Sequence, residues 1–223
     1  MSAALPILDL FPFIHPSIST REAKLAAAAA LDAACTTHGF FYLTNHGIAP
    51  ALQAQVLALA RHFFLQPLAA KATVARPAGG ARGYQQLGEN VTQGRRDQHE
   101  AIDFYSEGAG GAGVLAGPNR WPEGVPGFRV AFEAFWAQLR ALGDAVMRAM
   151  AWALGYEAAE DVLARCTRDG YWVARVIGYP PLRAPEGGGV SCGVHTGAFC
   201  ARAGGRAALT TRRLRVHDVS ARG

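Results

Sequence analysis

Residues Gly39–Ile48 read GFFYLTNHGI, and this stretch decides the fold. Its first half, Gly39–Leu43, is aromatic and apolar between turn-forming residues, which is typical of a buried strand. Pro50 follows and predicts a helix that runs to about Leu65, because proline fits the first turn of a helix. The stretch therefore predicts a strand-to-helix turn, and we expect the side chain of His46 to order that turn through hydrogen bonds.

Further helices and strands are predicted outward from this stretch. A helix is expected at Thr20–Thr37, where eight alanines raise the helix propensity, and another at Phe128–Gly155, where apolar residues recur at helical spacing. Residues 76–127 are rich in glycine and proline and predict mostly loop. Short strands are predicted at Leu5–Leu10, Ala101–Tyr105, Tyr171–Tyr179 and Val190–His195.

The composition is that of a globular protein without a membrane partner. Half of the 223 residues are apolar and 17% are charged, so the chain can bury a core of ordinary size. No apolar run approaches the ~20 residues that a membrane helix needs, and the N-terminus lacks the basic start of a secretory signal. The four cysteines are widely spaced without a CxxC, a pattern that favours reduced thiols and a cytoplasmic location.

Residues 201–223 differ in composition from the rest of the chain. They hold six arginines and one aspartate, which accounts for the whole net charge of +5. The preceding body is therefore neutral, which argues against a nucleic-acid partner, because binding DNA or RNA needs a basic patch on a folded surface. This tail has no aromatic residue and no apolar face, so we expect it to be disordered and interpret it as the product of an altered reading frame. Sequencing the transcript across the codons for Thr196–Cys200 tests that interpretation.

A candidate metal ligand lies in Gly187–Cys200, GGGVSCGVHTGAFC. His195 stands near the end of an apolar, strand-like run. Because side chains on a strand alternate between two faces, a second ligand on the same strand would stand two residues later. That position is Gly197, which offers no donor atom. The residues therefore predict one metal ligand, His195, without a second ligand on the same strand.

Two other groupings of metal-binding residue types fit a metal site poorly. Cys192, His195 and Cys200 lack a fourth ligand and have a spacing unlike that of zinc sites. His217 and Asp218 are neighbours, and neighbouring side chains on a strand point to opposite faces, so the pair is unsuited to share an ion with His195.

Two further sets of residues are interpreted as structural or solvated. The first contains histidines expected at the surface or at helix ends: His38, His62 and His99. The second contains arginines of a solvated loop cluster: Arg82, Arg95 and Arg96.

The segment GFFYLTNHGI resembles the N-terminal signature of the 2-oxoglutarate- and iron(II)-dependent oxygenases of the isopenicillin N synthase-like superfamily. Weaker segments match that family in the same order along the chain. They are Pro6–Leu10 (PILDL), Arg82–Asn90 (RGYQQLGEN), Glu100–Tyr105 (EAIDFY), Arg175–Pro181 (RVIGYPP) and Val194–Thr196 (VHT). The resemblance covers about residues 5–196.

The resemblance implies an α+β fold in which an N-terminal helix and strand region, residues 1–127, packs on a double-stranded β-helix, or jelly roll. Residues 128–200 would supply the linking helix and the first strands of an incomplete jelly roll, followed by the disordered tail, residues 201–223. The implied function is oxidation of a small organic substrate coupled to decarboxylation of 2-oxoglutarate, with Fe(II) activating dioxygen.

The resemblance also implies roles for single residues. His195 matches the first iron ligand, and Tyr179 matches a tyrosine that contacts 2-oxoglutarate in relatives with a Tyr-Pro-Pro segment. The family holds iron with two histidines and one carboxylate. Gly197 stands at the position of the carboxylate, and the second histidine and the arginine that pairs with 2-oxoglutarate find no match in this sequence. We therefore expect an incomplete iron site and no activity from the chain as written.

Two alternatives remain compatible with the resemblance. One is a non-catalytic binding or pairing module that retains only the N-terminal region and self-associates through exposed strand edges. The other is a halogenating oxygenase, in which chloride would take the coordination position left by Gly197, although such enzymes keep the second histidine. Production of succinate from 2-oxoglutarate distinguishes an enzyme from a binding module.

Overall fold

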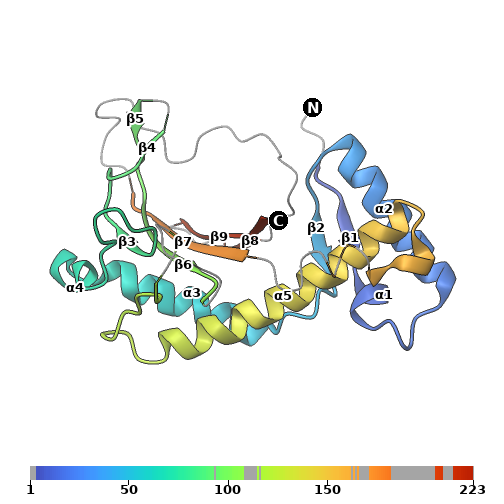
Figure 1. Ribbon diagram of the computed structural model, residues 1–223, viewed down its shortest axis with the longest axis horizontal. Coiled ribbons are helices and arrows are strands. Elements are labelled where there is room, and N and C mark those ends of the chain that lie inside the picture. The colour runs from blue at the N-terminus through green and yellow to red at the C-terminus, as the bar shows by residue number, and fades with distance from the viewer. Residues whose placement is uncertain are drawn as a thin grey trace. The chain divides into compact units, whose positions relative to one another are not determined.

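The computed structural model describes residues 4–92, 94–107, 115, 117–161, 163, 165 and 171–181, and the backbone of 204–207 and 213–222 (Figure 1). Within those ranges the chain forms two compact units. The first unit contains residues up to 49 and from 136 to 165, and the second contains residues 50–135 and 171–222. Both units combine helices with strands, which agrees with the predicted α+β class.

The first unit is built on a pair of short parallel strands. Its elements are β1 (Ile7–Asp9), α1 (Phe11–Ile14), α2 (Arg21–Thr37), β2 (Tyr42–Thr44), most of α5 (Phe128–Ala153) and a 3-10 helix (Glu157–Ala159). Helix α2 connects the two strands, and Ile7 of β1 stands opposite Tyr42 of β2. A helix between parallel strands is the usual way to join them.

Helix α2 confirms the helix predicted at Thr20–Thr37. The Thr20 hydroxyl accepts a hydrogen bond from the backbone N–H of Ala23 at 3.2 Å, so Thr20 is the N-cap. The buried residues Ala28, Leu31 and Ala34 recur every three positions and therefore line one face of the helix.

The turn after β2 forms as the sequence predicts. Asn45 and Gly47 adopt positive φ angles of 49° and 77°, and the backbone N–H of Ile48 donates to Nδ1 of His46 at 3.1 Å. The ordering role predicted for His46 is confirmed. The strand itself is more exposed than predicted, since Tyr42 is 48% accessible. A two-stranded sheet covers little apolar surface, so one face of this pair stays open.

The second unit is built on an antiparallel sheet of five strands. Its helices are α3 (Pro50–Leu65), α4 (Leu68–Ala72) and the start of α5. The strands are β3 (Gly83–Gln85), β4 (Val91–Thr92), β5 (Arg95–Arg96), β6 (Glu100–Tyr105), β7 (Tyr171–Tyr179), β8 (Gly204–Ala207) and β9 (Arg213–Arg222). The sheet has the order β3-β6-β7-β9-β8, and β4 and β5 form a separate hairpin (Figure 1). The predicted strand Ala101–Tyr105 is thus confirmed as β6.

One face of the five-stranded sheet packs on an aromatic core. Phe104 of β6 lies 4.7 Å from Trp121 and 6.2 Å from Phe128 between ring centroids. Phe63 of α3 lies 5.7 Å from Tyr84 of β3 and 5.9 Å from Phe128. Phe63, Phe104 and Phe128 are at most 1% exposed, so these rings fix the strands against the helices.

Gly178 of β7 lies directly against Phe64 of α3. A Cβ built on Gly178 would stand 2.9 Å from the Phe64 ring, which is closer than such atoms approach without a shift. The absence of a side chain at Gly178 therefore lets α3 pack closely on the sheet. Since strand side chains alternate, Ile177 and Tyr179 point to the opposite face.

The prediction of a disordered tail is not confirmed, because the described backbone of residues 204–207 and 213–222 forms strands. Strand β9 pairs along the whole of β7, and β8 pairs with β9. The prediction considered only apolar burial, whereas the edge of β7 that faces away from β6 offers a row of backbone groups for hydrogen bonding. Residues 213–216 (RLRV) also alternate basic and apolar side chains, which is the period of a strand.

Helix α5 confirms the long helix predicted at Phe128–Gly155. None of the helices within the described ranges combines the length and the apolar character that crossing a membrane demands. The predicted strand Val190–His195 lies outside the described residues. The predicted limits of the domains at residues 127 and 200 stay predictions.

Candidate active-site face

Tyr179, the residue predicted to contact 2-oxoglutarate, ends β7 on the sheet face opposite the aromatic core. Its ring centroid lies 5.6 Å from that of His99, which immediately precedes β6 and is buried. The prediction that His99 lies at the surface or at a helix end is wrong, because His99 is buried directly before Glu100, the first residue of β6 that pairs with β7. His38 and His62 are exposed at helix ends, as predicted.

The predicted iron ligand lies outside the described part of the chain. This holds for His195, for Gly197 and for the two cysteines of the alternative metal cluster, Cys192 and Cys200. Among the described residues, no group of three or more histidine, cysteine, aspartate or glutamate side chains is placed to hold a metal ion. His217 of β9 is known by its backbone, which stands opposite Arg175 of β7 in the sheet.

Strand alternation brings a set of polar side chains to the face that carries Tyr179. Asp103 of β6 stands directly opposite Arg175 of β7, and Gln85 of β3 lies next to them. Arg175 and Tyr179 are separated by two strand periods and therefore share a face. We call the surface formed by Gln85, Asp103, Arg175 and Tyr179 the inner face.

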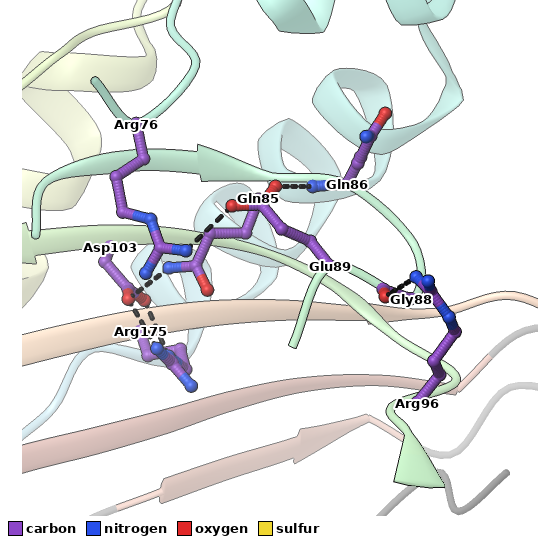
Figure 2. A network of polar contacts seen from close by, with 8 residues as sticks. All are labelled: Arg76, Gln85, Gln86, Gly88, Glu89, Arg96, Asp103 and Arg175. Carbon is purple, nitrogen blue, oxygen red and sulfur yellow. Dashed lines mark hydrogen bonds and ion pairs between the residues drawn. The ribbon is translucent and has the colours of Figure 1, made fainter. Parts of the chain in front are cut away.

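Asp103 is the centre of a hydrogen-bond network on the inner face (Figure 2). Arg175 donates to its two carboxylate oxygens, from Nε at 2.7 Å and from Nη2 at 2.5 Å. Gln85 donates to the same carboxylate from Nε2 at 2.6 Å. A two-pronged guanidinium and a third donor fix the orientation of this carboxylate, whose residue is 1% exposed.

The network contains one partly exposed cationic side chain and one buried acceptor without a donor in the described ranges. The Arg175 side chain is 35% exposed although its partner Asp103 is buried. Gln85 is fully buried, and its Oε1 finds no hydrogen-bond donor among the described residues. A buried acceptor without a donor is costly, so such a group marks a place where a polar ligand gains affinity.

A second set of contacts closes the loop beside the inner face (Figure 2). Arg76 donates to Glu89 at 2.8 Å, and Glu89 also accepts the backbone N–H of Gln86 at 3.0 Å. Arg96 donates to the carbonyl oxygen of Gly88 at 2.8 Å. The Arg96 contact ties the segment after β3 to the β4–β5 hairpin, and the Arg76 contact ties the same segment to the residues before β3.

Arg82 is buried rather than solvated, which corrects the prediction for this residue. Its guanidinium donates to Asn119 Oδ1 at 2.8 Å and to the carbonyl oxygens of three residues, Tyr105, Ser106 and Leu115. The sequence gives no sign of these acceptors, because backbone carbonyls are common to every residue. Arg95 and Arg96 are exposed, as predicted.

Tyr105 ends β6 near the inner face and lies under the guanidinium of Arg82 at 5.2 Å. Burial raises the pKa of the Tyr105 hydroxyl, and the negative charge of Asp103 raises it further. The phenol is therefore neutral at physiological pH and adds no charge to the inner face.

The face that packs on the helices carries its own ion pair. Lys71 of α4 donates to Glu100 of β6 at 2.5 Å and to the carbonyl oxygen of Phe64 at 3.1 Å. The Tyr84 hydroxyl donates to the same Glu100 carboxylate at 2.6 Å. Burial, and then this hydrogen bond, raises the pKa of Tyr84. Lys71, Tyr84 and Glu100 satisfy one another's hydrogen bonds, so we assign these three side chains a role in stability.

Sequence reasoning missed the inner-face network. It assigned a strand to the segment that contains Asp103 and matched the segment of Gln85 to a family motif, but gave neither side chain a role. One signal was present: Asp103 occurs between apolar residues of a strand, where a carboxylate is rare unless it is paired.

The comparisons with known proteins agree with this architecture. Residues 5–124 match the family described as non-haem dioxygenase in morphine synthesis N-terminal. A homoarginine-6-hydroxylase of Glycine max is 38% identical over 209 residues, which cover 87% of this chain and 63% of that protein. A homoarginine-6-hydroxylase of Oryza sativa subsp. japonica is also 38% identical, with 86% and 62% covered. The chain therefore spans less than two thirds of the length of these relatives.

A solved structure shows the same fold. A full-length protein of Neurospora crassa, crystallised in complex with alpha-KG and thymine, aligns with a TM-score of 0.76 at 22% identity and covers 96% of this chain and 73% of that one. Since the family match extends over more than half of the sequence, the protein belongs to the non-haem dioxygenase N-terminal family of the 2-oxoglutarate- and Fe(II)-dependent oxygenases.

Proposed function

We propose that the protein serves the reaction of its family, the oxidation of a small organic molecule coupled to decarboxylation of 2-oxoglutarate. The observation that carries this proposal is the inner face, where Tyr179 shares one side of the sheet with the Asp103–Arg175 pair. A substrate on this face would meet polar groups that are already oriented, which lowers the cost of binding it. When bound, Fe(II) and 2-oxoglutarate supply the activation of dioxygen.

We assign roles to residues as follows. Tyr179 contacts 2-oxoglutarate, and its ring is held in place by His99. His195 is the first iron ligand, and the strands of residues 171–222 are the first strands of the jelly roll. The widely spaced cysteines support a cytoplasmic site of action, with a small molecule rather than nucleic acid as the partner.

For the substrate we propose a basic amino acid, with homoarginine as the first probe. The relatives at 38% identity are named homoarginine-6-hydroxylases. The inner face fits such a molecule, because Arg175 attracts a carboxylate and the buried Gln85 Oε1 accepts an N–H. A zwitterion with further N–H donors offers both groups.

The test is the yield of succinate in a reaction with Fe(II), 2-oxoglutarate and homoarginine. The chain as written is expected to form little succinate, because Gly197 brings no carboxylate to the iron and the second histidine and the arginine find no match in the sequence. Gly197→Asp supplies the carboxylate that the family pattern has two residues after His195, so the affinity for Fe(II), and with it the yield of succinate, is expected to rise. Gly197→Asn is the matched control, since it has the same size without the charge.

Two outcomes would contradict the proposal. If folded Gly197→Asp protein forms no succinate above background, the 223-residue chain does not carry out the family reaction and the non-catalytic module is supported. If Gly197→Asn raises the yield as much as Gly197→Asp, residue 197 is no carboxylate ligand position. Omission of homoarginine separates substrate oxidation from uncoupled turnover of 2-oxoglutarate.

A further inference from the structure

The first unit contains a cavity of about 210 Å³ that has no part in the proposed reaction. It is lined by residues of α1, of the turn after β2 and of α5, all within the first unit. By residue the lining is mostly apolar, including Phe13, Ile14 and Leu142, and polar atoms make up about half of its accessible surface. The volume is several times the ~30 Å³ that one water occupies, so it suits a small organic molecule.

Three polar side chains interrupt the apolar lining, and none of them is acidic. They are His46, Gln138 and Arg148. In His46 and Gln138 one acceptor atom already accepts a backbone N–H. The remaining polar group of each side chain is therefore the one that a ligand can meet.

His46 offers a donor. Its Nδ1 accepts the backbone N–H of Ile48 at 3.1 Å, so in the neutral ring the proton stands on Nε2. Gln138 is oriented in the same way, because its Oε1 accepts the backbone N–H of Ala49 at 3.0 Å. The amide NH2 of Gln138 is then the group left for a ligand. Both side chains therefore present N–H groups.

Arg148 supplies a positive charge without a counter-charge. It is half-buried, and its Nη2 donates a long hydrogen bond to the carbonyl oxygen of Phe13 at 3.4 Å. Within the described part of the chain it forms no ion pair, whereas Arg21 and Arg129 each pair with a glutamate. A partly buried cation without a partner is unfavourable, and an anionic ligand would relieve that cost.

We propose that this cavity binds a small organic carboxylate. Arg148, His46 and Gln138 donate to the carboxylate oxygens, and the apolar walls receive the hydrocarbon part of the molecule. None of the lining residues is acidic, which favours an anion over a cation, and the apolar side chains of the lining favour an organic acid over an inorganic ion. The site gives the motif GFFYLTNHGI a binding role in addition to its role in the turn.

The test uses two probes of the same shape on the whole 223-residue chain. Benzoate and benzyl alcohol are titrated separately, and binding is followed by calorimetry and by chemical shifts of backbone amides. Benzoate is expected to bind and to shift the amides of Gly47 and Ile48. Benzyl alcohol is expected to bind at least about tenfold more weakly, since it lacks the charge that Arg148 attracts.

Two variants of α5 separate this site from a general effect of charge. Arg148→Met keeps the length of the side chain and is expected to weaken benzoate binding about tenfold or more. Arg140→Met removes an exposed arginine of the same helix that does not line the cavity, and it should leave binding unchanged. The proposal is overturned if benzoate does not bind, if benzyl alcohol binds equally well, or if the two variants behave alike.

Discussion

The coupling between Asp103 and Arg175 can be measured with Asp103→Asn. Asparagine has nearly the size of aspartate, but it is neutral and replaces one carboxylate oxygen by an NH2 group. At the Oδ2 position the new NH2 faces two donors, Nη2 of Arg175 at 2.5 Å and Nε2 of Gln85 at 2.6 Å, and at the Oδ1 position it faces Nε of Arg175 at 2.7 Å. The variant therefore removes the counter-charge of Arg175 and creates a contact between two donors.

The expected loss follows from the burial of the two partners. Removing one partner of a fully buried ion pair costs about 3–5 kcal/mol. The Arg175 side chain is 35% exposed, so water stabilises part of the charge that is left. Rotation of the Gln85 amide lets its unused Oε1 accept from the new NH2 group. We therefore expect the free energy of unfolding to fall by about 2 kcal/mol.

The assay is a double-mutant cycle in urea, followed by circular dichroism. Arg175→Met and the double variant complete the cycle with Asp103→Asn. If the pair is coupled as the structure shows, the double variant loses at least about 1 kcal/mol less than the sum of the single losses. Additive losses within about 0.5 kcal/mol would refute the coupling. Arg129→Met, which breaks an exposed ion pair within α5, is the control and should cost less than about 0.5 kcal/mol.

Three further predictions concern other parts of the fold. Gly83→Ala places a Cβ 2.6 Å from a backbone carbonyl oxygen at a φ of +119°, so the free energy of unfolding in urea should fall by about 2 kcal/mol or more. The control is Gly79→Ala, where the Cβ meets open space and the loss should be about 1 kcal/mol. Because the folded pKa of Tyr84 is raised, its contribution to stability is present below pH ~10 and lost as the pH rises above that value. The free energy of unfolding, measured at several alkaline pH values, should therefore decline less for Tyr84→Phe than for the unchanged protein. Thr20→Ala removes the N-cap bond of α2 and should cost about 1 kcal/mol, whereas Thr20→Ser should restore most of it.

The parts of the fold that depend on local sequence were predictable. The helices Arg21–Thr37, Pro50–Leu65 and Phe128–Ala153 follow from alanine content, an N-terminal proline and apolar spacing. The His46 turn was predictable for the same reason, since its hydrogen bond reaches only two residues along the chain.

The parts that depend on distant partners were not predictable. Asp103 meets an arginine that lies 72 residues away in sequence, and no local pattern specifies that pairing. Arg82 likewise finds its acceptors 23 to 37 residues away. The strand β9 was not predictable from the tail, because its pairing depends on the edge of β7, a feature of the sheet and not of the tail itself.

The contact of Gly178 with Phe64 restricts the order in which the two positions can change during evolution. Any side chain at 178 collides with the aromatic ring, whereas a smaller residue at 64 leaves a hole that a methyl group at 178 can fill. The combination of leucine at 64 with alanine at 178 is therefore reachable by one route, in which position 64 changes first. Among relatives, alanine at 178 should occur together with a smaller residue at 64, so the two positions form a pair whose history is directional.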